Sequence, residues 1–218
     1  MKKGLLMLLA SGMMTSAFAQ SEKYMKAMEP LVVAVDTTRS IVGLTDLANS
    51  FERIANAEKT QWLPFYYAAL ATVNAAYSYS DDSFGDKSVV IDPLADKAET
   101  FLAKAEEFSK DNSEIWVVKK IIASVRMMAN PMARYQEYSP IATAALETAK
   151  KLNPENPRVY LQEGQDLFFT PEQFGGSKAE AKKRFEETVS KFSTYQPESG
   201  IHPNWGLGAA KYFLSQIK

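Results

Sequence analysis

Few residues in this chain of 218 could carry out a reaction. It has one histidine, His202, and no cysteine. A cysteine nucleophile and a zinc site of the His/Cys type are therefore excluded. His202 stands before Pro203 at the expected start of a helix, and no serine motif of the nucleophile-elbow type accompanies it. We interpret His202 as an exposed or capping residue and expect the protein not to be an enzyme.

Carboxylates occur as neighbours at Glu106-Glu107 and at Glu186-Glu187. Adjacent residues on a helix point about 100° apart, and both pairs have lysines close by, which is typical of a solvated helix face. A pair of carboxylates acting as acid and base is therefore not expected. The glycines at 175–176 and at 206–208 are not followed by a lysine, so a phosphate-binding loop is not expected either.

The acidic loop 81–92 has an incomplete calcium-binding pattern. Asp81, Ser83, Gly85 and Asp92 fall at positions 1, 3, 5 and 12 of a calcium-loop count. However, the sixth position is Asp86 instead of glycine, and the twelfth is aspartate instead of glutamate. The favoured interpretation is a solvated linker, with calcium binding left open, and we expect no metal and no cofactor.

The start of the chain is typical of a secretory signal peptide. Two lysines follow Met1, an apolar run covers 4–14, and Ala17-Phe18-Ala19 precedes the expected cleavage before Gln20. The run is too short for the roughly 20 residues of a spanning helix. We predict a signal peptide over 1–19 and an exported protein, periplasmic or alternatively secreted or envelope-associated. Without cysteine it is not a lipoprotein.

Composition limits the mature chain to one globular domain or a compact repeat array over 20–218. The sequence is 46% hydrophobic and 23% charged, which excludes a disordered chain. Loss of two lysines with the signal peptide takes the formal charge from −1 to −3. With no basic tract, nucleic acid and anionic membranes are not expected as partners.

The segment 152–164 predicts two antiparallel helices joined by a tight corner. Pro154 disfavours helical backbone at Asn153, while Asn156 can cap a new helix whose first residue is Pro157. Small or large apolar residues repeat at i, i+4 and i+7 on both sides of the corner. They are Ala142, Leu146 and Ala149 before it, and Tyr160, Gly164 and Leu167 after it.

Other helices are predicted from cap residues and prolines. The expected starts are Thr45, Asp92-Pro93, Ser139-Pro140, Ser177 with Glu180, and His202-Pro203, and another helix is expected after the turn Asp111-Asn112-Ser113. Pro30 is expected to kink or divide the first helix. The chain is therefore predicted to be all-α, with four helix pairs.

These spacings resemble the tetratricopeptide repeat (TPR), in which small and aromatic residues alternate along two helices before a proline turn. Trp116, Tyr160 and Trp205 stand at the head of successive units 44 and 45 residues apart, longer than the family's 34. Lys120 occupies a position where the family has a small residue. The resemblance implies a right-handed array of antiparallel helix pairs, an α-solenoid with degenerate repeats and long loops.

Such an array implies an inner wall that takes a peptide or a partner helix. The wall positions predicted from the repeat register are Tyr67, Arg158, Gln165 and Phe169. For each aromatic residue among them, packing in the core is the favoured interpretation. Our main hypothesis is a non-enzymatic scaffold that binds a protein or peptide. The alternative is a soluble small-molecule carrier with an aromatic pocket lined by Trp62, Tyr66 and Tyr67.

Overall fold

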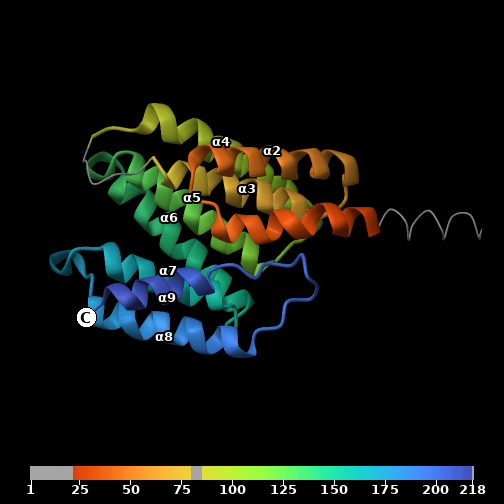
Figure 1. Cartoon of the computed structure of the whole chain (residues 1–218). Helices are drawn as coiled ribbons and strands as arrows, with labels where there is room; N and C mark the ends of the chain where they lie inside the picture. The colour runs from red at the N-terminus through yellow and green to blue at the C-terminus, as the bar shows by residue number, and fades with distance from the viewer. Residues whose placement is uncertain (1–21, 80–84, 218) are drawn as a thin grey trace, which may run out of the picture.

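The computed structural model describes residues 22–79 and 85–217, and within these ranges the chain forms helices and loops without a strand (Figure 1). The all-α fold class is therefore confirmed. The predicted signal peptide lies outside the described residues, as do Asp81 and Ser83 of the calcium count.

The chain begins with a helix over residues 22–37. It continues with α2 (Ile41–Glu58), α3 (Trp62–Tyr77), α4 (Ser88–Phe108), α5 (Ser113–Ala129), α6 (Pro131–Leu152), α7 (Pro157–Phe169), the short 3-10 helix η1 (Glu172–Phe174), α8 (Lys178–Thr194) and α9 (Leu207–Gln216).

The predicted caps Asn156 and Ser177 are confirmed, and Asn112 in the predicted turn before α5 caps that helix. The Asn112 side chain accepts a hydrogen bond from the backbone N–H of Glu114 at 2.8 Å. Asn156 accepts one from Arg158 N–H at 3.0 Å, and Ser177 accepts one from Glu180 N–H at 3.2 Å. Each cap satisfies a backbone donor that the first helical turn leaves free, so the corner before α7 forms as expected.

Three helices begin earlier than predicted. Ser40, not Thr45, caps α2, and its hydroxyl accepts a hydrogen bond from Gly43 N–H at 3.2 Å. Pro93 and Pro140, expected at helix starts, lie inside α4 and α6. Both prolines are exposed, so water can reach the backbone carbonyl that each leaves without a partner. The helix over 22–37 likewise continues through Pro30.

The last helix begins later than predicted. Residues 203–206 have no helical structure, and α9 begins at Leu207 instead of His202-Pro203. Gly206, just before it, has a φ of 108°, in the left-handed region that favours glycine. A Cβ there would stand 2.9 Å from a Leu161 side-chain carbon, so this turn holds α9 close to α7.

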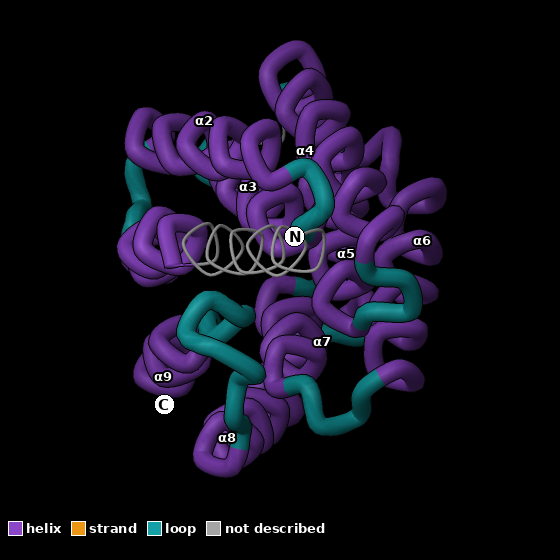
Figure 2. The backbone as a smooth tube through the Cα atoms, turned by 90° about the vertical axis from the view of Figure 1, so that its right-hand side faces the viewer, coloured by secondary structure: helices purple, strands orange, loops and turns teal. Residues whose placement is uncertain are grey.

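Neighbouring helices pack against each other along the chain, with α3 and α5 buried on most of their surface. A Cβ on Gly164 would lie 2.5 Å from the Phe185 ring, so this glycine allows α7 and α8 to approach closely. Lys120 is buried on α5, and its ammonium group pairs with Asp166 at 2.6 Å. The helix over 22–37 lies between α2 and α9 (Figure 2).

Candidate functional site

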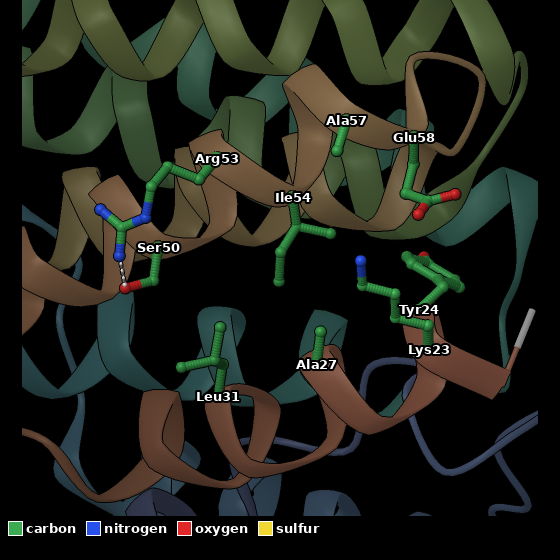
Figure 3. Close-up of a pocket in the computed structure, with 9 residues that line it drawn as sticks. All are labelled: Lys23, Tyr24, Ala27, Leu31, Ser50, Arg53, Ile54, Ala57 and Glu58. Carbon is green, nitrogen blue, oxygen red and sulfur yellow. Dashed lines mark hydrogen bonds between the residues drawn. The ribbon is translucent and has the colours of Figure 1, made fainter. Parts of the chain in front are cut away.

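A cleft of about 390 Å³ lies between the helix over 22–37 and α2. We call it the N-terminal cleft. Figure 3 shows the two helices facing each other across it, each contributing side chains that point toward the gap. The lining residues are Lys23, Tyr24, Ala27 and Leu31 from the first helix, and Ser50, Arg53, Ile54, Ala57 and Glu58 from α2.

Small residues keep the N-terminal cleft open. The first helix packs on the core through Tyr24, Met28 and Val35, which are all buried. Ala27 and Ala57 are exposed on the cleft side, and neither is large enough to close the gap between the helices. Leu31 and Ile54 are partly buried and give the cleft an apolar floor.

Tyr24 brings a buried polar atom to this cleft. Its side chain is 8% exposed, and its hydroxyl has no hydrogen-bond partner among the described residues. Burial raises the pKa of the Tyr24 phenol, and the nearby Glu58 carboxylate raises it further. The phenol therefore stays protonated at neutral pH, as a buried donor at the edge of the cleft.

Two cations at the edges of the N-terminal cleft are not neutralised by the described chain. Arg53 is exposed and donates to the Ser50 hydroxyl at 2.9 Å, and neither Arg53 nor Lys23 forms an ion pair with a described carboxylate. Glu58 also lines the cleft, at the end where Lys23 and Tyr24 lie (Figure 3). The cleft thus combines an apolar floor with cations that are available to a ligand.

A second cleft, of about 320 Å³, lies between α4, α5 and α6, and we call it the central cleft. Its apolar lining resembles that of the first, but its cations are bound within the protein. Arg126 donates to Asp96 at 2.6 Å and to Glu99 at 2.7 Å, and Lys119 pairs with Glu106 at 2.6 Å. These cations have little capacity left for an anionic ligand.

Two of the predicted wall residues are buried in the core. Tyr67 is 1% exposed, stacks on Phe51 with ring centroids 5.1 Å apart, and donates to the Ile201 carbonyl at 3.1 Å. Arg158 is fully buried and donates to both oxygens of Glu114, at 2.7 and 2.6 Å. Neither side chain is accessible to a partner, because the loop before α9 covers both.

The other two wall residues lie on the outside of α7. Gln165 is partly exposed, and its side-chain oxygen accepts a hydrogen bond from Gln162 at 2.8 Å. Phe169 is 67% exposed and meets Phe168 and Phe213 edge to face. The structure therefore does not bring the four predicted residues together on one surface.

The predicted aromatic pocket is filled. Tyr66 is fully buried and packs edge to face against both Trp62 and Tyr67. Its hydroxyl accepts a hydrogen bond from the Trp205 indole at 2.8 Å and donates to Glu114 at 3.2 Å. These aromatic residues form core, which leaves no space for a ligand among them.

His202 lies in a surface turn before α9. Its Nδ1 is 2.8 Å from the Ser199 hydroxyl, and its Nε2 is 3.2 Å from a Glu198 oxygen. The same hydroxyl accepts a hydrogen bond from Ile201 N–H, as expected when a serine caps its own turn. All these groups come from one short segment, and Ser199 caps this turn, so His202 does not cap the start of α9.

Within 22–79 and 85–217, no group of three or more His, Cys, Asp or Glu side chains is placed to hold a metal ion. Asp92, counted in the calcium pattern, has both carboxylate oxygens bound by Arg134, at 2.6 and 2.7 Å. No helix in the same ranges is long and apolar enough to cross a membrane.

The sequence did not reveal the residues of the N-terminal cleft. The apolar spacing of Tyr24, Met28, Leu31 and Val35 marks one face of the first helix, and this signal was available. However, the spacing does not say that α2 lies opposite, or that Ala27 and Ala57 lie on the two sides of the gap.

No protein-family profile and no curated protein matches the chain. Among solved structures it is similar to the HusA haemophore from Porphyromonas gingivalis, with a TM-score of 0.76 and 34% sequence identity. The similarity covers 89% of this chain and 92% of that chain. Because a haemophore is a carrier of haem, this finding contradicts the predicted protein-binding scaffold and favours the alternative, a small-molecule carrier.

Proposed function

The chain belongs to the same family as the HusA haemophore, and on this premise we propose that it is a carrier that binds haem in the N-terminal cleft. The observation that carries the proposal is 34% identity along nearly the whole length of both chains. The chemistry of the cleft provides independent support.

Haem is a flat molecule with an apolar ring and two carboxylate groups on one edge. The apolar ring suits a floor made by Leu31 and Ile54, and the cleft volume lies within the range of small-molecule sites, about 300–1,000 Å³. The carboxylates suit Lys23 and Arg53, which have no carboxylate partner in the described chain. Tyr24, which also lines the cleft, would add its aromatic ring to the apolar contacts.

Two further parts of the proposal come from the sequence. The segment 1–19 has the pattern of a secretory signal peptide, and an exported carrier would meet haem outside the cytoplasm. The packing of successive helices is compatible with a degenerate TPR-like array of antiparallel pairs. In this proposal the array acts as a rigid support for the first helix pair and not as a peptide-binding wall.

An absorbance titration tests the carrier function. Haem is added to the purified protein, and the Soret band is followed in difference spectra against free haem. The proposal expects a saturable change with one haem bound per chain. A change that rises without saturation, as for adsorption to any protein, would contradict it.

A further inference from the structure

The N-terminal cleft has two chemically different ends. Arg53 and Ser50 lie at one end, and Lys23, Tyr24 and Glu58 lie at the other (Figure 3). The two ends are therefore not equivalent for a ligand whose charges are gathered on one edge.

Arg53 is better suited than Lys23 to bind carboxylates. A guanidinium group has five N–H donors in a planar fork that matches a carboxylate, and one hydrogen bond, to Ser50, is made here. Ser50 is partly exposed beside it, with its own hydroxyl donating to the Asp46 carbonyl at 2.8 Å. The remaining Arg53 donors are solvated and available.

The opposite end disfavours carboxylates. Glu58 lines it and forms no ion pair with a described cation, so a second carboxylate placed there would be repelled. The positive charge of Lys23 offsets the negative charge of Glu58, so this end of the cleft is close to neutral in formal charge. Tyr24 adds a neutral donor with an apolar ring.

From this asymmetry we infer that the cleft binds its ligand in one orientation, with the carboxylate edge at Arg53 and the apolar edge toward Tyr24. The inference rests on the proposed function and specifies its ligand class: a flat apolar molecule with its carboxylates on one edge. Arg53 is then the residue that determines specificity for acids, and Lys23 contributes less.

The test compares haem with haem dimethyl ester, in which both carboxylates are blocked. Binding of each is measured with the unaltered protein, with Arg53→Gln and with the matched variant Lys23→Gln. Both residues are exposed, so both variants are expected to keep the helical circular dichroism spectrum.

For the unaltered protein, haem should bind about tenfold more tightly than the ester, because blocking the carboxylates removes their charge-assisted hydrogen bonds. Arg53→Gln should weaken haem binding about tenfold, leave ester binding unchanged, and bring the affinity ratio close to one. In Lys23→Gln, most of the difference in affinity between haem and the ester should remain. Added salt should weaken the binding of haem and not that of the ester.

Two outcomes would overturn the inference in different ways. If both ligands bind and the ratio is lost in Lys23→Gln instead of Arg53→Gln, the orientation is wrong while the carrier function stands. If neither ligand binds the unaltered protein saturably, the carrier function fails, and the orientation fails with it.

Discussion

The N-terminal and central clefts have similar volumes, about 390 and 320 Å³, and both have apolar floors, yet they differ in whether their cations form ion pairs with the described chain. Carboxylates of α4 bind Arg126 and Lys119 in the central cleft. In the N-terminal cleft, Lys23 and Arg53 have no carboxylate partner among the described residues, and the Tyr24 hydroxyl has no hydrogen-bond partner there. Available polar groups, and not volume, therefore distinguish the proposed haem site from the central cleft.

The largest expected effect is on the free energy of unfolding. It distinguishes the buried, ion-paired Arg158 from the exposed Arg53, which has no carboxylate partner among the described residues. Arg158→Met should lower the free energy of unfolding by about 3–5 kcal/mol, because the buried Glu114 carboxylate would lose its cationic partner. Arg53→Met should change it by less than about 0.5 kcal/mol. Urea unfolding followed by circular dichroism measures both. Equal losses in the two variants would show that Arg53 is also structural.

Filling each cleft in turn tests which one binds the ligand. Ala27→Trp should weaken haem binding at least about tenfold, because the indole occupies the N-terminal cleft. Ala103→Trp is the matched control, since Ala103 is an exposed alanine lining the central cleft. Haem titrations of the two variants should differ clearly. Loss of binding in Ala103→Trp alone would move the site to the central cleft.

Removal of the unpartnered hydroxyl should stabilise the ligand-free protein. A buried polar group without a hydrogen bond costs about 1–3 kcal/mol, so Tyr24→Phe should raise the free energy of unfolding by about 1 kcal/mol. In the control Tyr160→Phe, the lost hydroxyl donates to the Pro154 carbonyl at 2.8 Å, and a loss of about 1 kcal/mol is expected. The same sign for both variants would mean that Tyr24 has a partner in solution.

The smallest effect concerns Asp36, at the other end of the helix that forms the cleft wall. Its carboxylate accepts a hydrogen bond from Gly206 N–H at 3.2 Å, and burial raises its pKa despite opposing effects of that bond, Arg39 and Arg158. A raised carboxyl pKa means that the folded protein binds the proton more tightly than the unfolded chain. The charged form is thus disfavoured at neutral pH, and this group adds stability as the pH falls through its folded pKa toward 3.8.

Asp36→Asn keeps an acceptor oxygen and removes the charge. Its melting temperature should lie slightly above that of the unaltered protein at neutral pH, and the difference should close as the pH falls toward 4. Thermal melts across this range check the prediction, with the exposed Asp46→Asn as control. A difference that widens on acidification would show that the charged carboxylate stabilises the fold.

Local signals in the sequence predicted the helices well and the site poorly. Asn156 and Ser177 cap helices as expected, because a cap depends on residues a few positions apart. Pro93 and Pro140 were misleading, since an exposed proline can lie inside a helix when earlier residues begin it. The predicted wall residues Tyr67 and Arg158 are buried by the loop before α9, whose position no local pattern indicates.

The most direct test of the proposed haem site is hydrogen exchange of the purified protein with and without added haem. Haem in the N-terminal cleft should slow amide exchange in peptides covering 23–31 and 50–58, which contain its lining residues. Peptides covering 99–106 and 119–126, which line the central cleft, should exchange as before. Protection confined to the central cleft, or spread evenly over all helices, would contradict binding in the N-terminal cleft.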